Sequence, residues 1–260
     1  MGILYAVLII TGVGFVFGII LSVASVIMAV PVDKRVEEIR ECLPGANCGA
    51  CGFAGCDGYA EAVASGEAEP YKCTPGGETT AKALSELLGV EIKTERFVAV
   101  VGCNHSLEGV NTDYIYEGRQ SCASAKLLYG GQLACKYGCM GFGDCVSACE
   151  YGAIKVIDGR ARVDREKCVG CAKCVKSCPS SVIALIPYDS KVTVACHNLE
   201  KGAVARKKCT AACIGCMKCT KVCESDAIKV ENFLASIDTH KCTNCGKCAE
   251  VCPQGCIVIN

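Results

Sequence analysis

The sequence predicts an α+β protein with one N-terminal transmembrane helix, a small cysteine-rich domain and two tandem copies of a second cysteine-rich module. Three observations lead to this prediction. Positions 1–32 carry no charged side chain, 26 of the 260 residues are cysteine, and the nine cysteines from Cys122 to Cys178 recur at the same spacing from Cys196 to Cys252. We expect the anchor, the linker with the small domain, a connector and the two modules at residues 1–32, 33–95, 96–120, 121–189 and 190–260.

The segment 1–32 is apolar or small throughout, and a helix needs about 20 such residues to cross a bilayer. A cleaved signal peptide is the alternative, but the basic opening of such a peptide is missing and the apolar run is about twice the usual length. Lys34, Arg35 and Arg40 follow the segment, whereas nothing basic precedes it. Because positive flanks stay in the cytoplasm, this single-pass helix should hold the chain at the cytoplasmic face of the cell (inner) membrane.

The composition narrows the classes of partner and cofactor. A formal net charge of zero gives no reason to expect nucleic acid, which requires a basic face. In a short secreted chain this cysteine content would indicate disulfides, but the spacings here are those of metal ligands, which need reduced thiols. No glycine-rich phosphate loop of the Rossmann or Walker type is present, so we expect neither flavin nor NAD on this chain.

The small domain contains the pattern C-x2-C-x4-C-x16-C, formed by Cys48, Cys51, Cys56 and Cys73. Three close cysteines with glycines between them let the backbone wrap around an iron–sulfur cluster and point its N–H groups at the sulfurs. The fourth cysteine follows a predicted helix. Zinc is the alternative here, because the fourth ligand is distant in sequence.

The strongest motif is CVGCAKCVKSCP at residues 168–179, with spacing C-x2-C-x2-C-x3-C-P. In this run three thiolates bind one four-iron cluster and the fourth binds a neighbouring cluster. Zinc does not explain it, since four ligands from so short a segment cannot surround one ion tetrahedrally. A disulfide framework would be strained by sulfurs this crowded.

The region 121–260 is a duplication in which each copy predicts a two-cluster, bacterial ferredoxin-like module with exchanged fourth ligands. In the first copy the assigned sets are Cys135, Cys139, Cys145, Cys178 and Cys149, Cys168, Cys171, Cys174. In the second copy they are Cys213, Cys216, Cys219, Cys252 and Cys223, Cys242, Cys245, Cys248. Phe142 stands where the second copy has Cys216, so the first copy uses Cys135 at an irregular spacing.

Five [4Fe-4S] clusters leave six cysteines without a role: Cys42, Cys103, Cys122, Cys196, Cys209 and Cys256. Cys103 and Cys196 each follow a short β-like run and are therefore expected to be related. A sixth cluster built from some of Cys103, Cys122, Cys196 and Cys209 is one interpretation, and inert or structural thiols are the other. The three histidines, His105, His197 and His240, are expected at the surface.

The anchor, the segment LPGANCGACGFAGC at residues 43–56 and the tandem ferredoxin motifs together resemble the B subunit of the Rnf complex, a membrane ferredoxin:NAD oxidoreductase that moves sodium ions or protons. The resemblance covers essentially the whole chain, although the small domain alone is also similar to modules of corrinoid iron–sulfur proteins. It implies a membrane-anchored polyferredoxin that accepts electrons from soluble reduced ferredoxin and relays them through [4Fe-4S] clusters to flavin subunits. The implied partners are the flavin- and NAD-binding RnfC protein and the membrane proteins RnfA, RnfD, RnfE and RnfG.

Two other functions fit the same residues. The chain could reduce a different partner, such as a redox regulator, as the related Rsx system suggests, or it could be a metal-stabilised scaffold in which some sites hold zinc. No Ser/His/Asp or paired-carboxylate constellation is apparent, so no bond-making chemistry is expected of this chain itself. The single helix carries no charge within the membrane and offers no ion path of its own.

Overall fold

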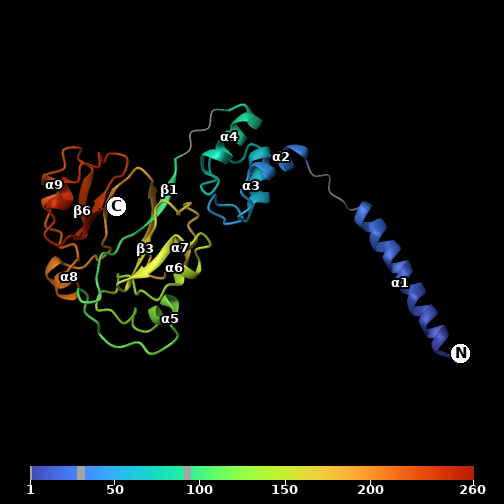
Figure 1. The fold of residues 1–260 in the computed structure, drawn as a ribbon, viewed down its shortest axis with the longest axis horizontal. Helices are drawn as coiled ribbons and strands as arrows, with labels where there is room; N and C mark the ends of the chain where they lie inside the picture. Colours follow the sequence, from blue (N-terminus) through green and yellow to red (C-terminus); the bar gives the residue numbers. More distant parts are fainter. Residues whose placement is uncertain (1, 28–32, 91–94) are drawn as a thin grey trace.

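The computed structural model describes residues 2–27, 33–90 and 95–260. Helix α1 (Gly2–Ile27) extends away from the remainder of the chain, as Figure 1 shows. Its described side chains are mostly exposed, with Ile10 at 73% and Phe15 at 69%. By length and composition α1 is able to cross a membrane, which agrees with the predicted anchor. The last residues of that predicted anchor, 28–32, lie outside the described residues.

Three helices form the N-terminal domain: α2 (Lys34–Cys42), α3 (Cys56–Ala64) and α4 (Gly77–Leu88). The Asp33 carboxylate caps α2 by accepting a hydrogen bond from the N–H of Arg35 at 3.0 Å. The three helices bury one apolar cluster that includes Ile39, Tyr59 and Leu84. This small core fixes the loop that carries the closely spaced cysteines between α2 and α3.

The first half of the C-terminal body contains two antiparallel strand pairs and three short helices. Its elements are β1 (Phe97–Val101), α5 (Cys122–Leu127), α6 (Asp144–Ser147), β2 (Ile154–Ile157), β3 (Arg160–Val163), α7 (Lys173–Ser177) and β4 (Ile183–Pro187). Strand β1 pairs with β4, and β2 pairs with β3. Strand β1 lies in the predicted connector, residues 96–120, at the β-like run expected before Cys103, and it contributes a strand to the first half.

The second half repeats this plan with β5 in the place of β1. Its elements are β5 (Val192–Val194), α8 (Gly202–Lys208), α9 (Lys218–Lys221), β6 (Ile228–Glu231), β7 (Leu234–Ile237), α10 (Lys247–Glu250) and β8 (Ile257–Ile259). Strand β5 pairs with β8, and β6 pairs with β7. The body therefore mixes short helices and strands, as the predicted α+β class requires.

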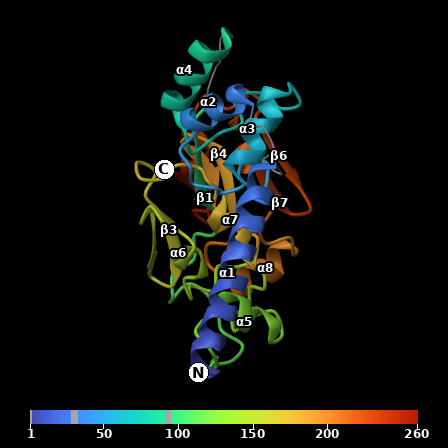
Figure 2. The same ribbon diagram turned by 90° about the vertical axis from the view of Figure 1, so that its right-hand side faces the viewer.

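The two halves share part of one apolar core. Figure 2 shows both halves together below helices α2 and α4 of the N-terminal domain. Val110, Leu133 and Cys135 of the first half pack with residues of the second half such as Val192 and Cys209. Backbone pairing joins the halves as well, because Val110 forms a β-bridge with Cys209. We call the region around Val110, Cys135 and Cys209, where loops of the two halves pack against each other, the junction.

Candidate metal centres

Four thiols of the N-terminal domain line one pocket together with Tyr59 and short backbone loops. They belong to Cys48, Cys51, Cys56 and Cys73. The buried Tyr59 hydroxyl donates to the Glu69 carbonyl at 2.8 Å and accepts from the Lys72 N–H at 3.1 Å, which holds the segment leading to Cys73. Burial raises the pKa of Cys73 to about 11. This thiol therefore keeps its proton at neutral pH until a metal displaces it.

A second pocket gathers four cysteines of the first half, as the motif spacing predicted. They are Cys149, Cys168, Cys171 and Cys174. The N–H of Ala99, on β1, donates to Cys168 Sγ at 3.3 Å. Gly170 has a φ of +68°, and a Cβ there would lie 2.6 Å from the Phe97 carbonyl oxygen. Glycine therefore lets β1 approach the sulfurs closely, and backbone N–H groups aimed at sulfur suit a cluster.

The third pocket departs from the sequence assignment. Its cysteines are Cys122, Cys139, Cys145 and Cys178, whereas Cys135, expected as a ligand here, is not among its lining residues. Cys135 instead packs in the core that the two halves share. The irregular spacing that led to Cys135 thus has another solution, in which Cys122 supplies the thiol that Phe142 lacks.

Three hydrogen bonds explain why Cys122 reaches this pocket. The Asp144 carboxylate accepts hydrogen bonds from the N–H groups of Cys122 and Ala123, both at 2.9 Å, and from the Ser121 hydroxyl at 3.1 Å. Asp144 directly precedes a pocket cysteine, so it ties the start of α5 to that loop. Burial alone would raise the pKa of Asp144, but these hydrogen bonds outweigh burial and lower it.

In the second half, the corresponding pocket is lined by Cys213, Cys216, Cys219 and Cys252, as the spacing predicted, and also by Cys256. Cys256 Sγ lies 3.5 Å from Cys252 Sγ. A hydrogen bond from Cys256 lowers the pKa of Cys213. The residue that corresponds to Cys256 in the first half is Val182, which has no such donor.

The last predicted set lies near the C-terminus. Burial raises the pKa of Cys248, and the charges of Cys242 and Cys245 act in the same direction, so these three thiols lie near one another. Cys223, the predicted fourth member, accepts a hydrogen bond from the Ala227 N–H at 3.3 Å. Cys245 is exposed, whereas its counterpart Cys171 is buried.

The donor sets fit iron–sulfur clusters. Soft thiolates lining an apolar pocket are the ligands of four-iron clusters. Within the described ranges, no three or more His, Cys, Asp or Glu side chains are placed to hold one metal ion. All 26 cysteines are free thiols, so none is removed from this set by a disulfide.

Sequence reasoning missed several residues around these sites. His105 was expected at the surface, but only 3% of it is exposed and its Nδ1 lies 3.1 Å from Cys103 Sγ. Asn198 is 1% exposed and also contacts sulfur. The signal that could have found both is their position two residues after Cys103 and Cys196, which follow similar β-like runs. His240 is exposed as expected.

Comparison with protein families matches three cysteine-rich segments. Residues 43–75 match the FeS family of Fe-S cluster domains, residues 160–183 match a 4Fe-4S binding domain, and residues 212–256 match a 4Fe-4S dicluster domain. None of these segments contains Cys103, Cys122 or Cys135, whose positions come from the structure alone.

Three curated relatives are similar to almost the whole chain. The B subunit of the Na(+)-translocating ferredoxin:NAD(+) oxidoreductase complex of Acetobacterium woodii is 42% identical over 94% of this chain and 74% of that protein. The B subunit of the proton-translocating complex of Clostridium ljungdahlii is 45% identical over 88% of this chain and 81% of that protein. The chain belongs to the RnfB family. The RnfB relative from Methanosarcina acetivorans, named as part of an ion-translocating oxidoreductase complex, is 38% identical over 97% of this chain and 96% of that protein.

Proposed function

We propose that this chain is the electron-transfer subunit of an ion-translocating ferredoxin:NAD oxidoreductase, as its RnfB relatives are named. When bound, [4Fe-4S] clusters supply one-electron carriers that accept and pass on an electron without a substrate bond being made. Soluble reduced ferredoxin would be the donor, and flavin- and NAD-binding partner subunits would be the acceptors. The C-terminal body would then consist of two tandem two-cluster ferredoxin modules.

One observation carries this proposal: segments that carry the thiols of successive pockets contact one another through direct hydrogen bonds. Burial raises the pKa of Cys171, and charges on Cys48 of the N-terminal pocket and Cys149 of its own pocket raise it further. Cys174 of the second pocket likewise acts on Cys145 of the third, whose pKa is raised to about 12, first by burial. Electron transfer needs such proximity between carriers.

The N-terminal domain is held against the second pocket by direct hydrogen bonds. Lys176 Nζ donates to the Gly49 carbonyl at 3.3 Å, and the Thr74 hydroxyl donates to the Gly170 carbonyl at 3.3 Å. Both contacts join loops that carry cysteines of two different sets. The residues therefore set the separation between carriers, which is the task of the protein in a relay.

We further propose that α1 anchors the chain in the cell membrane with the cysteine-rich part in the cytoplasm. The helix is long and apolar enough, and basic residues follow it in the sequence while none precedes it. Reporter fusions at the C-terminus test this sidedness. Activity of a cytoplasmic reporter such as green fluorescent protein is expected, and activity of an exported alkaline phosphatase fusion would reverse the assignment.

The relay itself is tested with anaerobically purified full-length chain and the assembled complex. We expect the brown chain to lose visible absorbance when reduced ferredoxin is added, and the assembled complex to form NADH. Colourless, sulfide-free protein would refute the relay and leave a scaffold. Reduction without NADH formation in the complete complex would instead indicate a different acceptor, such as a redox regulator.

A further inference from the structure

Four cysteines that line none of the pockets described above lie at the junction. They are Cys103, Cys135, Cys196 and Cys209, exposed by only 8%, 9%, 8% and 8%. Cys135, Cys196 and Cys209 pack in one buried cluster. Cys103 is tied to the same place, because His197, next to Cys196, has its Nδ1 3.3 Å from the carbonyl oxygen of Gly102, which precedes Cys103. A buried group of four thiols at one place requires an explanation beyond apolar packing.

The four thiols are related by the internal repeat of the structure. Val101 of β1 and Val194 of β5 occupy equivalent positions, since they pair with Ile183 and Ile257, which correspond to each other in the duplicated sequence. Cys103 and Cys196 each lie two positions beyond these valines.

Equivalent hydrogen bonds confirm the correspondence. The Cys139 N–H donates to Cys103 Sγ at 3.4 Å, and the Cys213 N–H donates to Cys196 Sγ at 3.3 Å. Cys135 and Cys209 also occupy matching positions in the duplicated sequence. Each half therefore supplies one cysteine after its first strand and one before its next pocket.

Buried polar groups hold these sulfurs from both sides. Asn198 Nδ2 of the second half donates to Cys135 Sγ of the first half at 3.5 Å, and the Asn198 N–H donates to Cys196 Sγ at 3.5 Å. His105, at the equivalent position in the first half, contacts Cys103. Thiolates that bind a cluster usually accept hydrogen bonds from surrounding polar groups. Burying such polar groups around thiols that bind nothing would cost free energy, because a neutral thiol is a weak hydrogen-bond acceptor.

The surrounding loops close the site from solvent. The Asn111 N–H donates to the Lys208 carbonyl at 2.9 Å, and the Ala134 N–H donates to the Asn111 carbonyl at 2.8 Å. This backbone bridge joins the residues directly preceding Cys209 and Cys135.

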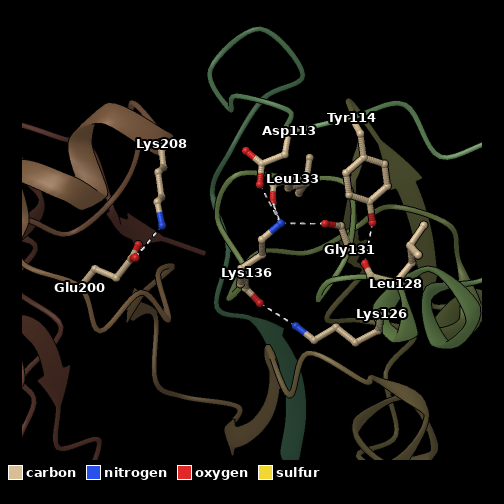
Figure 3. Close-up of polar contacts among 9 residues, drawn as sticks. All are labelled: Asp113, Tyr114, Lys126, Leu128, Gly131, Leu133, Lys136, Glu200 and Lys208. Carbon is tan, nitrogen blue, oxygen red and sulfur yellow. Dashed lines mark hydrogen bonds and ion pairs between the residues drawn. The ribbon is translucent and has the colours of Figure 1, made fainter.

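Two lysines fix the same loops, as Figure 3 shows. Lys136 Nζ contacts Asp113 Oδ2 at 2.8 Å and the Gly131 carbonyl at 2.9 Å, and Lys208 Nζ contacts Glu200 Oε1 at 2.5 Å. Lys136 follows Cys135 and Lys208 precedes Cys209, so each ion pair holds one cysteine-bearing loop in place.

We propose that Cys103, Cys135, Cys196 and Cys209 bind a further [4Fe-4S] cluster that connects the two halves. Binding forms one iron–thiolate bond per cysteine and releases each thiol proton to solvent, while the preassembled four-iron, four-sulfide core is supplied by cellular cluster assembly. The site lies between Cys139 of the third pocket and Cys213 of the corresponding second-half pocket. This inference rests on the proposed relay, because it supplies the carrier between its two ferredoxin modules.

The test counts iron and acid-labile sulfide in reconstituted, anaerobic full-length chain. With the junction site filled, about 24 iron atoms per chain are expected, and about 20 without it. Cys209→Ala and Cys135→Ala should each remove about four iron atoms. Cys42→Ala is the matched control and should remove none, because the half-buried Cys42 lies outside every set.

A Cys48→Ala variant separates the two proposals, since it should lose about four iron atoms from the N-terminal pocket. If wild type holds about 20 iron atoms and Cys48→Ala about 16, the junction proposal is overturned while the relay stands. Iron-free wild type would overturn both. Native mass spectrometry of wild type gives the cluster number even if the junction variants do not fold, and a mass for only five clusters would also reject the junction site.

Discussion

The two halves of the C-terminal body share one plan but use their cysteines differently. At one position the second half has Cys216 where the first has Phe142. The second-half pocket is complete with Cys216, whereas the first-half pocket contains Cys122, brought in from outside the ferredoxin-like motif. One substitution in a duplicated module thus redistributes thiols and leaves Cys135 free for the junction.

The halves also differ in what covers them. The N-terminal domain contacts the loop of Cys171 in the first half through Lys176 and Thr74, whereas the equivalent Cys245 in the second half is exposed. The first half is therefore an internal part of the proposed relay. The second-half set around Cys245 is open to solvent.

Converting the first half to the arrangement of the second should produce the largest effect. Cys122→Ala should remove about four iron atoms, because its pocket loses a thiolate. Adding Phe142→Cys should restore them by supplying the thiol at the position that Cys216 occupies. Iron and sulfide analysis of the single and double variants checks this. Full iron content in Cys122→Ala would return the ligand role to Cys135.

The next effect concerns Gly170, whose counterpart in the second half is Asn244. Gly170→Asn should destabilise the chain by about 2 kcal/mol or more, because the new Cβ meets the Phe97 carbonyl and the backbone there has a positive φ. Thermal inactivation, followed by loss of visible absorbance, measures it. Gly152→Asn is the control and should change the inactivation temperature much less, because Gly152 also has a positive φ of +58° but an added Cβ there meets no atom within 4 Å. Equal effects would show that the close approach of β1 is unimportant.

A smaller effect is expected at Asp144, which the second half replaces with the exposed Lys218. Asp144→Ala removes three hydrogen bonds that place Cys122, and cluster release into a chelator should become about 5- to 30-fold faster, equivalent to one or two kcal/mol. Since its pKa is lowered on folding, the Asp144 contribution is present at neutral pH and disappears as the pH falls below about 4. Lys218→Ala should leave the rate unchanged, and a similar acceleration there would contradict this role.

The smallest effect is expected at Cys256, whose equivalent in the first half is Val182. Cys256→Val removes a hydrogen bond to Cys213, so the pKa of Cys213 should rise and cluster loading of this pocket should shift to higher pH. The reduction potential of that cluster should fall by about 20 to 60 mV, the one-electron equivalent of about 0.5 to 1.5 kcal/mol. EPR-monitored titration measures it, with Val182→Cys expected to raise the potential of the first-half cluster. An unchanged potential in both variants would show that this thiol is only apolar packing.

Sequence spacing grouped cysteines that are close in the chain as the pockets of the structure do, but not those that are distant in the chain. The sets around Cys51 and Cys171 could be predicted because most of their cysteines lie within a few residues of one another, so the sequence spacing determines how close the thiols can be. Cys122 could not, since Asp144 brings it to its pocket across a long loop. The duplicated sequence also aligns Cys122 with Cys196, whereas strand pairing makes Cys103 the structural equivalent of Cys196. The burial of His105 involves a different non-local contact, because Arg160 of β3 donates a hydrogen bond to the Cys103 carbonyl at 2.8 Å.

The central claim is that thiolates of this chain hold a row of four-iron clusters that crosses the junction. Anomalous diffraction at the iron absorption edge from anaerobically grown crystals tests it most directly. The account predicts compact iron density at each thiol set, including one centre between Cys135 and Cys196, with every centre within tunnelling distance of the next. Isolated metal ions, sulfur–sulfur bonds in the pockets or a gap at the junction would contradict it.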